Sequence, residues 1–579
     1  MIKKVLLICA LMSLCTFGYT SGTYEGEAKG YGGQIKVQVK VSESRIESIN
    51  VLENKETDYV GTIAFDKLPK EMIEKQSVGI DSVAGATSTS AGLKMAVRSA
   101  LEKAGGNPVE FMKKPEVTPV EKKNTEYTAD VIVIGGGGAG LAAAVTAKQN
   151  GASVILIEKM PRLGGNTILS GGAYNAADPK RQKVQGIEDS TDLHYKHTFE
   201  GGDEKADPKL VRIFVDNAYP ALEWLESLGM KFNDELFTVL GGLHPRAHKP
   251  STPVGTGFIL TYKDFAEKNG IQIFYETEAK ELVTKDGRVV GVKGDSKTED
   301  IIFHANKGVV IATGGFGGDV EYRTKFNPNL KENILTTNHP GSDAVGIMMA
   351  EKVGANTIGM EYIQMLPMGD PRTGSLSGNI ELSVEDRIFV NKEGKRFVAE
   401  DARRDVMTNA LFQQPDAYMW TILDSQVYPT TDVKNNFNES IGELIAENRA
   451  VSANSIEELA EKIKVPVENL KKTIEDYNKA VDTKQDEFGR KLFGVRIEKA
   501  PFYAGARIPT VHHTMGGLQI NENAQVLDKD GKIIPGLYAA GEVTGGIHGT
   551  NRLGGNALAD ITVFGRIAGE NVAKEGIIK

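Results

Sequence analysis

Cysteine is almost absent from this chain. Only two of its 579 residues are cysteines, Cys9 and Cys15, and both lie within the first 18 residues. Those residues start with a pair of lysines and continue into a short apolar stretch, which is typical of an export signal and too short to cross a membrane comfortably. Without this segment the chain has no disulfide, thiol nucleophile, cysteine-ligated metal or cysteine-attached haem.

Three fates of the segment 1–18 remain open. Plain cleavage is one, a retained anchor is another, and lipidation of Cys15 as the first mature residue is the third. Leu14 stands where a lipoprotein signal carries a small residue, which argues against lipidation. We expect an exported protein that resides in the periplasm or at the cell surface. Whether a lipid on Cys15 anchors it there is left open.

Blocks of basic residues and further long apolar runs are also missing. The chain has 68 Lys and Arg against 77 Asp and Glu, a net charge of −9. Nucleic acid is therefore not an expected partner. No later stretch is long and apolar enough to cross a bilayer. The length and apolar content suffice for three or four ordinary domains.

A strand, a glycine-rich turn, a helix and a second strand begin near residue 130. The apolar run Val131–Ile134 leads into Gly135-x-Gly137-x-x-Gly140, which allows a tight turn, close approach of a pyrophosphate and helix packing on a sheet. The helix Ala139–Gln149 offers free N–H groups to a phosphate. The strand Ser153–Ile157 ends at Glu158, which can accept hydrogen bonds from a ribose. This pattern predicts a dinucleotide site, and a turn without ligand is the alternative.

The residues after Glu158 indicate which dinucleotide binds. A second glycine loop ends at Asn166-Thr167, and Ser170-Gly171-Gly172 follows it. This continuation is typical of flavoproteins, in which the second loop folds over the cofactor, and nicotinamide-only enzymes lack it. We therefore predict non-covalent FAD.

Residues 23–105 are predicted to form a small separate module. It contains a hairpin, Gln34–Val41 with Ile46–Val51, and a helix at Ala91–Lys103. Residues 81–87 resemble the D-x-x-[ST]-G-A-T motif of FMN-binding domains, in which a threonine carries FMN through a phosphoester bond. The resemblance implies covalent FMN on Thr87, although Ala84 departs from the motif. The alternative is a Ser/Thr cap of the helix.

The rest of the chain divides into a tether, an interrupted FAD-binding domain and an insertion. Residues 106–126 contain three prolines and are typical of a semi-rigid tether. The FAD-binding domain is expected at 127–363 and 506–579, because the strand-like runs GVVIATGGF and GLYAAGE both continue the flavin pattern. The more polar segment 364–505 is predicted to be a substrate-capping α+β domain.

Shorter elements are also predicted within these domains. We expect helices across Gly201–Leu240, a strand at Gln272–Ala279, a hairpin at Glu281–Gly294 turning at Asp286-Gly287, a strand at Gly308–Phe316, a hairpin at Asp386–Phe397, and helices at Ser455–Lys464 and Val467–Val481.

The combined motifs resemble one family. Residues 125–579 are similar to the flavoprotein subunits of soluble fumarate reductases, succinate dehydrogenases and L-aspartate oxidases, through GGGGAG, GGNT, ATGGF, HHTMGG and GGIHGTNRLGGN. With the FMN module, the arrangement resembles exported, haem-free 2-enoate reductases, among them urocanate reductases. The implied fold class is α/β, an FAD-binding Rossmann-like domain with an inserted α+β capping domain, preceded by a small α+β FMN-binding domain.

The resemblance also implies which residues contact FAD. They are Ala139, Glu158, Asn166, Thr167, Gly171, Gly172, Ala279, Asp343, His513, Glu542, Ala557 and Leu558. Glu542 is expected to bond the polyol chain of the flavin, and His513 to face FAD while His512 faces substrate. No third ligand has suitable spacing to join the two histidines, so no metal site is expected.

The family's chemistry sends a hydride from flavin to one alkene carbon and a proton from an arginine to the other. The alkene accepts hydride when cations stabilise the developing enolate of its carboxylate. The resemblance implies that Arg552 grips this carboxylate and that His512 adds a hydrogen bond. It places the proton donor at Arg404, with Arg403 as the alternative. A guanidinium rarely gives up a proton, but a carbanion-like acceptor supplies the driving force.

Two departures from the fumarate reductases bear on the substrate. Leu366 stands where they carry a histidine for a second carboxylate, and their proton-relay residues are absent near Ile380 and Ser383. A second carboxylate buried here would cost roughly several kcal/mol. Glu381 lies where urocanate reductases place an acid against the imidazole, and a carboxylate bonds an imidazole N–H well. We therefore predict urocanate, with electrons reaching the FMN domain from a membrane-associated, cytochrome or flavin donor.

Other functions remain open. Leu366 also fits acrylate, methacrylate or cinnamate, and Glu381 is alternatively a surface acid or an ion-pair partner. Glu385, Asp386 and Arg387 are candidates to replace the missing relay. A non-catalytic flavin electron carrier is the alternative of another class, and Arg404, His512 and Arg552 argue against it. An oxidase that uses oxygen is a third alternative.

Overall fold

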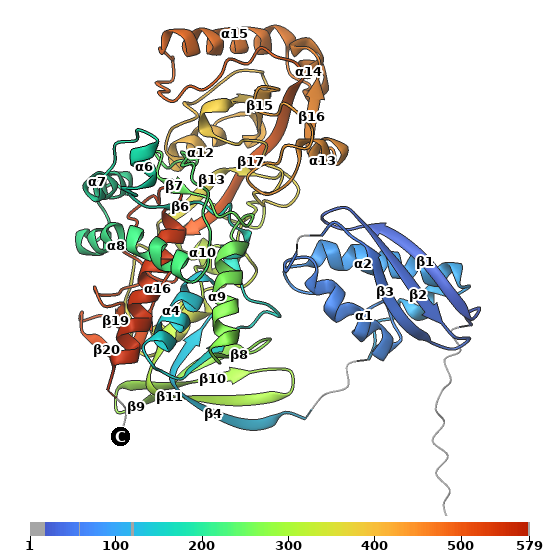
Figure 1. Cartoon of the computed structure of the whole chain (residues 1–579), viewed down its shortest axis with the longest axis vertical. Coiled ribbons are helices and arrows are strands. Elements are labelled where there is room, and N and C mark those ends of the chain that lie inside the picture. The colour runs from blue at the N-terminus through green and yellow to red at the C-terminus, as the bar shows by residue number, and fades with distance from the viewer. Residues whose placement is uncertain (1–17, 57, 117–120, 577–579) are drawn as a thin grey trace, which may run out of the picture. The chain divides into compact units, whose positions relative to one another are not determined.

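The computed structural model describes residues 18–56, 58–116 and 121–576, so Cys9, Cys15 and nearly all of the predicted export segment lie outside the described residues. The chain forms two compact units, Met1–Glu121 and Lys122–Lys579 (Figure 1). Within the described part of the chain, no helix combines the length and the apolar character that a membrane span requires.

The first unit is a three-stranded antiparallel sheet packed against two helices. Its elements are β1 (Gly22–Lys29), β2 (Gln34–Val41), β3 (Ile46–Glu53), α1 (Ile63–Lys75), α2 (Thr87–Lys103) and α3 (Pro108–Phe111). Alternate residues of β2, including Val37 and Val39, are fully buried against Leu93 and Val97 of α2. This period of two is what places one face of a strand in a core.

Three predictions for this region can be compared with the structure. The hairpin is confirmed as β2–β3. The helix begins at Thr87 rather than Ala91, because the polar residues before Ala91 form its first turn and Ser90 Oγ donates to Ala86 O over 2.7 Å. The predicted tether 106–126 is too long at both ends, since Phe111 of α3 is buried in the core of the first unit and β4 already starts at Lys123.

The second unit is built on an eight-stranded, largely parallel sheet. Its strands are β4 (Lys123–Ile134), β5 (Val154–Ile157), β8 (Gln272–Phe274), β9 (Glu278–Lys285), β10 (Arg288–Asp295), β11 (Glu299–Ile311), β19 (Gln525–Leu527) and β20 (Ile533–Ala539). Two small two-stranded sheets accompany it: β6 (Tyr174–Asn175) with β7 (Ala247–His248), and β12 (Thr357–Ile358) with β18 (Gly517–Leu518). The strands β20, β11, β4, β5 and β8 are parallel neighbours in this order, with β8 at the edge, as the predicted dinucleotide fold requires.

The second unit also contains nine helices outside the cap, in the part of the chain that the structure describes. They are α4 (Gly138–Gln149), α5 (Gly165–Leu169), α6 (Arg181–Val184), α7 (Thr191–Gly201), α8 (Pro208–Ser227), α9 (Thr256–Lys268), α10 (Val320–Phe326), α11 (Val345–Lys352) and α16 (Asn556–Lys574). Figure 1 shows α4 and α16 side by side, and their backbones meet at Gly569, where an added Cβ would lie 2.3 Å from Ala143 O. The last helix of the chain is thereby fixed against the first helix of the cofactor fold.

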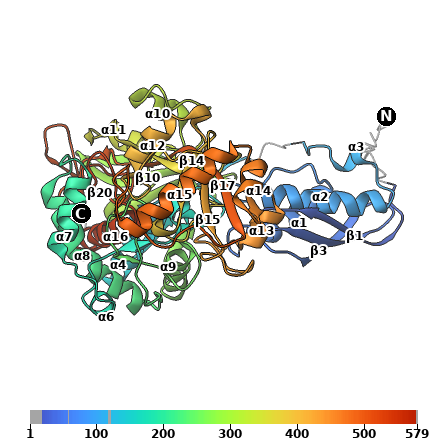
Figure 2. The ribbon, with the colours of Figure 1, turned by 90° about the horizontal axis from the view of Figure 1, so that it is seen from above.

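A second, five-stranded sheet occupies most of the segment 364–505 that was predicted to be a cap, and its last strand extends to Thr514. Its strands are β13 (Ile363–Gly369), β14 (Ile388–Asn391), β15 (Met419–Asp424), β16 (Ala450–Ala453) and β17 (Phe502–Thr514). Its helices are α12 (Arg404–Phe412), α13 (Ile441–Ala446), α14 (Ile456–Ile463) and α15 (Val467–Thr483). Two 3-10 turns lie at Val384–Asp386 and Pro415–Ala417. Helices α14 and α15 pack on β15 and β17 through one apolar cluster (Figure 2). Strand β17 leaves the cap and carries His512 and His513 near its end.

Two sequence predictions are wrong here. The hairpin at Asp386–Phe397 does not form, because β14 pairs with the distant β15 and the chain after Asn391 turns inward, where Arg396 binds Glu400. The helical prediction for Gly201–Leu240 holds only for α8, which ends at Ser227. The hairpin turning at Asp286-Gly287 and the two helices α14 and α15 are confirmed.

Candidate active site

A cavity lies at the carboxyl ends of β4, β5 and β11, where α/β sheets bind their ligands. It is lined by residues 134–139, 157–160, 165–167, 277–279, 312–314, 339, 341, 342, 345, 540, 542 and 561. Among the residues predicted to contact FAD, this lining includes Ala139, Glu158, Asn166, Thr167, Ala279 and Glu542. Segments distant in the sequence are thus brought together as the resemblance implied.

The glycine turn has the shape that a pyrophosphate needs. An added Cβ at Gly140 would lie 1.9 Å from Gly135 O, so helix and strand could not pack as closely with a larger residue. At Gly137, by contrast, nothing lies within 4 Å of the Cβ position. The open space beside Gly137, at the start of α4, leaves the helix N-terminus accessible to an anion.

Glu158 closes the turn from the other side. Its Oε2 accepts the backbone N–H of Gly136 over 2.8 Å, and its Oε1 accepts that of Met160 over 2.7 Å. Burial raises the pKa of this carboxyl group, and the two N–H donors oppose the shift. Each oxygen keeps a further lone pair, so the carboxylate can also receive ribose hydroxyls.

Asn166 and Glu542 connect the second glycine loop to the end of β17. Asn166 Nδ2 donates to Asn338 Oδ1 over 2.8 Å and to Glu542 Oε2 over 3.3 Å. The Nδ1 of His513 lies 3.6 Å from Glu542 Oε2, and burial lowers the pKa of this histidine well below its usual range. His513 is therefore neutral and lies next to Glu542, which lines the cofactor cavity.

The remaining residues predicted to contact FAD do not line this cavity directly. Asp343 forms an ion pair of 2.6 Å with Lys159, which does line it. Ala557 and Leu558 lie in the first turn of α16, whose N-cap Gly555 provides no side-chain cap. Gly171 and Gly172 follow α5. The residues present fit FAD, because the glycine turn, the acid and the uncapped helix ends form one cradle.

Arg404 extends from the cap toward the cofactor fold. It is the first residue of α12, and its Nε donates to Leu240 O over 3.0 Å. The side chain passes between two glycines, since an added Cβ would lie 2.8 Å from Arg404 Cγ at Gly241 and 2.9 Å from Arg404 Nη2 at Gly554. In the described part of the chain, Nη2 has no hydrogen-bond acceptor, so one end of the guanidinium remains available.

Arg403, the alternative proton donor, has a different environment. Its guanidinium binds Asp203 over 2.6 Å and Asp405 over 2.8 Å, and these two carboxylates are 49% and 39% exposed. An arginine in two partly exposed ion pairs is held fully charged. The structure thus separates the two neighbours: Arg403 lies at the surface and Arg404 is buried.

A glutamine that sequence reasoning missed joins the two buried arginines. The single oxygen Oε1 of Gln364 accepts from Arg404 Nη1 and from Arg552 Nη2, each over 3.2 Å. Its Nε2 donates to Asn551 Oδ1 over 2.9 Å and to Arg552 O over 2.7 Å, which fixes the amide's orientation. Gln364 therefore sets the spacing of the two guanidinium groups.

The two arginines are cations without an acid partner. Among the described residues neither Arg404 nor Arg552 lies within 4.0 Å of a carboxylate oxygen, and the Nε of Arg552 is buried without an acceptor. Burial lowers the pKa of Arg552 to about 10. Burial and Arg552 together lower the pKa of Arg404 well below its usual range, and Glu381 opposes this. An anion bound beside the two guanidinium groups would favour the charged form of both arginines.

His512 lies beside this pair. Its Nδ1 is 2.8 Å from Thr337 Oγ1. Burial, Arg404 and Arg552 lower the pKa of His512 well below its usual range, so the ring is neutral. Thr337 Oγ1 also lies 3.4 Å from Val511 O, a longer and weaker contact; when the hydroxyl donates to Nδ1 instead, the neutral ring carries its hydrogen on Nε2, which can donate to a ligand. Thr337 is a second residue that the sequence did not indicate.

Glu381 is buried in an ion pair. Arg387 Nε donates to Glu381 Oε2 over 2.7 Å, and the Arg387 guanidinium lies 4.3 Å from the ring centre of Phe389. Among the described residues, the other oxygen, Oε1, accepts no hydrogen bond. Leu366 is 2% exposed in an apolar cluster. Glu381 is thus both the ion-pair partner that the sequence left open and an acid with one oxygen still able to accept.

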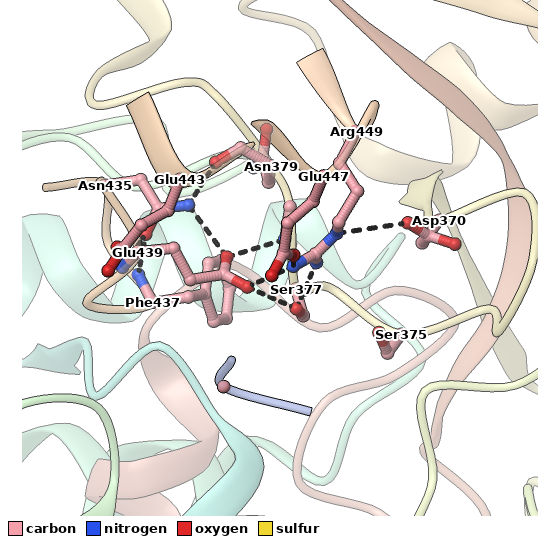
Figure 3. A network of polar contacts seen from close by, with 12 residues as sticks. Asp370, Ser375, Ser377, Asn379, Asn435, Phe437, Glu439, Glu443, Glu447 and Arg449 are labelled. Atoms are coloured by element: carbon pink, nitrogen blue, oxygen red, sulfur yellow. Dashed lines mark hydrogen bonds and ion pairs between the residues drawn. The ribbon is translucent and has the colours of Figure 1, made fainter. Parts of the chain in front are cut away.

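The loop before Glu381 is fixed by a charged network, shown in Figure 3. Arg449 donates to Glu439 over 2.7 Å and to Ser377, and Glu439 accepts from the backbone N–H of Gly378 over 2.6 Å. Asn435 Nδ2 donates to Asn379 O over 2.9 Å. These bonds fix residues 377–379, the part of the chain directly before Glu381.

In the first unit, the predicted FMN attachment residue Thr87 is exposed at the first position of α2. The N-cap residue, Ala86, offers no side-chain cap to the helix. A phosphoester on Thr87 would therefore meet uncapped backbone N–H groups and the positive end of the helix dipole. Asp81 is exposed and paired with Lys114 over 2.8 Å.

A metal site is not evident in the parts of the chain that the structure describes: no group of three or more His, Cys, Asp or Glu side chains could hold an ion.

Comparisons with known proteins agree with this geometry. A family described as "FAD binding domain" matches residues 130–558, and one described as "FMN-binding domain" matches residues 30–102. The chain therefore contains the binding domains for both flavins, with an FAD-binding α/β fold and a separate FMN-binding domain.

Relatives define the family more closely. The chain is 39% identical to an NADH:acrylate oxidoreductase of Vibrio harveyi, over 96% of this chain and 61% of that protein, and 38% identical to a urocanate reductase of Eggerthella lenta, over 96% and 93%. It is also similar to the open conformation of a flavocytochrome c3 fumarate reductase, with a TM-score of 0.64 and 36% identity over 77% of this chain and 78% of that chain. The chain belongs to the family of flavin-dependent 2-enoate reductases. It spans about three fifths of the length of the acrylate relative.

Proposed function

We propose that this protein reduces the carbon–carbon double bond of an unsaturated monocarboxylate, with urocanate as the first candidate. The observation that supports this most strongly is the pair of buried guanidinium groups, Arg404 and Arg552, which share Gln364 Oε1 and have no acid partner among the described residues. Perturbed, unpaired cations beside a cofactor cavity are typical of an anionic substrate site.

Arg552 and His512 bind the carboxylate in this proposal. Arg552 supplies charge and directional N–H groups, and neutral His512 donates from Nε2. Both stabilise negative charge that develops on the carboxylate when the double bond is reduced. Because the site is buried, these contacts are stronger than they would be in water.

FAD, when bound and reduced, supplies the hydride. Arg404 holds the proton that the other alkene carbon receives, and its acceptor-free Nη2 is the atom placed to deliver it. The depressed pKa of Arg404 makes this arginine a better acid than an exposed guanidinium. Arg403 is unsuitable, since two carboxylates stabilise its charged form.

Urocanate is favoured by the second oxygen of Glu381. Arg387 keeps the carboxylate paired through Oε2, while Oε1 can accept an imidazole N–H. Buried Leu366 offers nothing to a second carboxylate, which argues against fumarate. Leu366 also supports the second candidate, an acrylate-type substrate with an apolar far end.

A panel assay tests the substrate. The holoenzyme is supplied with reduced viologen and with urocanate, acrylate, methacrylate, cinnamate or fumarate in turn. We expect the highest kcat/KM with urocanate and the lowest with fumarate. Turnover of fumarate without turnover of urocanate contradicts the proposal. Absence of turnover with every enoate favours an electron carrier, and rapid reoxidation by oxygen favours an oxidase.

Electrons are proposed to enter through FMN on Thr87, from a membrane-associated, cytochrome or flavin donor. The exposed hydroxyl at an uncapped helix start supports this attachment. Peptide mass spectrometry of protein from the native host tests it. A peptide containing Thr87 should carry the mass of FMN, and Thr87→Val should lack it. An unmodified peptide contradicts the attachment.

Export is proposed from the sequence of residues 1–18 alone. Cell fractionation and N-terminal sequencing of the mature protein test it and distinguish cleavage from lipidation at Cys15. A mature protein that begins at Met1 in the cytoplasmic fraction contradicts it.

A further inference from the structure

The two buried arginines come from different parts of the second unit. Arg404 begins α12 in the cap, and Arg552 precedes α16 in the cofactor fold. Both are cations, and each disfavours the other's charge. Gln364 bridges them through one oxygen, but an amide does not neutralise either charge. Other contacts must therefore hold these two chain segments together.

Asp203 provides such a contact at the surface. This residue follows α7, and its two carboxylate oxygens accept from Arg403 Nη1 over 2.6 Å and from Arg403 Nη2 over 3.0 Å. The hydroxyl of Thr550 also donates to Asp203 Oδ2. Arg403 is the residue before Arg404, and Thr550 is two residues before Arg552. One carboxylate thus binds next to both arginines.

The two sides of this contact are not equivalent. The segment of Asp203 is fixed to the Arg552 segment in other ways too: Thr550 N donates to Gly202 O over 3.1 Å, and Asn551 Nδ2 donates to Gly201 O over 3.0 Å. Among the described residues, Arg403 in contrast bonds to this segment only through the carboxylate of Asp203. Loss of that carboxylate would therefore break the contact of Arg403 with this segment and leave the cofactor side in place, while the Arg404 side chain would keep only its bonds to Leu240 O and Gln364 within the part of the chain that the structure describes.

We infer that Asp203 is a positioning residue for the reaction: by binding Arg403 and Thr550 it holds Arg404 of the cap at its working distance from Arg552. The inference rests on the proposed function, because it assigns Asp203 a role in the geometry of those two arginines. An exposed ion pair is ordinarily weak. This one is bidentate and supported by a hydroxyl, which gives it a defined geometry.

The chain offers a matched control. Asp405 also binds Arg403, over 3.1 and 2.8 Å, but it lies in α12 and, in the described chain, its carboxylate has no hydrogen bond to the cofactor fold. Asp203→Asn and Asp405→Asn each remove one negative charge beside Arg403. Asp203 has φ 54°, a conformation that asparagine tolerates well, so the backbone is not strained by the change.

The first measurement is steady-state viologen oxidation with the best enoate of the panel. We expect Asp203→Asn to lower kcat about tenfold with a smaller change in KM, since misplacement affects proton delivery from Arg404 more than carboxylate binding. Asp405→Asn should stay within about twofold of the wild type. Arg403→Gln should resemble Asp203→Asn, and the double variant should add little, because both remove one contact.

The second measurement is hydrogen–deuterium exchange of the oxidised holoenzyme, which requires no turnover. Peptides covering the start of α12 should exchange faster in Asp203→Asn than in Asp405→Asn, with unchanged exchange at α4. Equal behaviour of the two variants in both measurements overturns the inference. If the wild type reduces no enoate, the proposed function fails, and the exchange comparison still decides whether Asp203 anchors the cap.

Discussion

Two pairs of buried charged residues lie close together in the second unit, and they differ in whether a positive charge is paired with a negative one. Arg404 and Arg552 share an amide oxygen, and in the described chain they have no carboxylate partner. Glu381 and Arg387, close by, neutralise each other across 2.7 Å. Removing a charge from water is costly unless a partner compensates it. In the proposed function, the first pair is compensated by an anion that arrives with the substrate, whereas the charges of the second pair already compensate each other.

Other buried arginines show that a missing acid alone does not define a site. Arg323 also has no close acid, but it donates to four backbone carbonyls, those of Gly317, Leu330, Lys331 and Ile334. Arg404 differs, because its Nη2 donates to no acceptor among the described residues. In the proposed function, Arg404 is set apart from Arg323 by the combination of an unused Nη2 donor and a second unpaired guanidinium, that of Arg552, on the same glutamine oxygen.

The largest effect is expected from Arg552→Gln. This change removes the charge that binds the enoate carboxylate in the proposed function, and loss of one such donor typically lowers the rate roughly 10²–10³-fold. We expect kcat/KM to fall by that amount with FAD content unchanged, measured by viologen oxidation and flavin absorbance. An unchanged KM would mean that the carboxylate is bound elsewhere.

Gln364→Ala tests whether the amide sets the spacing of the arginines. It removes a hydrogen bond to each guanidinium, and a bond to a charged group is worth about 1.5–3 kcal/mol. We expect kcat/KM to fall roughly ten- to hundredfold. Gln364→Glu should also raise KM, because an internal carboxylate competes with the substrate for both arginines. A Gln364→Glu variant that binds enoate as well as the wild type contradicts this interpretation.

Glu381→Gln changes the second pair, because it removes the negative charge from the ion pair of Glu381 with Arg387. If Glu381 Oε1 accepts the imidazole N–H, kcat/KM for urocanate should fall about tenfold, and that for acrylate should change much less. The ratio of the two substrates in one variant corrects for any loss of folding. An equal fall for both substrates would assign Glu381 a purely structural role.

The pH dependence of the reaction should reflect the loss of the proton from Arg552, and it should show no titration of His512. Arg552 has a pKa of about 10, so it is protonated below that pH and loses its charge above it. The KM for the enoate should therefore rise as the pH passes about 10. His512 has a pKa well below its usual range, so no inflection near neutrality should arise from it. A pH series of initial rates checks both expectations.

The sequence was most informative where function depends on local structure. The turn Gly135-x-Gly137-x-x-Gly140 and the acid Glu158 lie in one continuous strand–helix–strand unit, so their pattern predicted their arrangement. The choice between Arg403 and Arg404 could not be made in this way. It depends on the start of α12, which buries one guanidinium and leaves its neighbour at the surface.

Gln364, Thr337 and Asp203 were missed for a related reason. Each has a common side chain with no motif of its own, and its partners lie far away in the sequence: Gln364 contacts Arg552, and Asp203 contacts both Arg403 and Thr550. The failed hairpin at Asp386–Phe397 shows the same limit, since β14 prefers a partner strand that local alternation cannot indicate.

The comparison of Arg404→Lys with Arg403→Lys tests the central claim most directly. Both changes keep the positive charge, but only Arg404 is buried, and in the proposed function it is the guanidinium of Arg404 that delivers the proton. With the best enoate under reduced viologen, we predict that Arg404→Lys lowers kcat roughly 10²–10⁴-fold, while Arg403→Lys, which can still pair with Asp203, keeps most of the activity. Full turnover in Arg404→Lys would contradict the account.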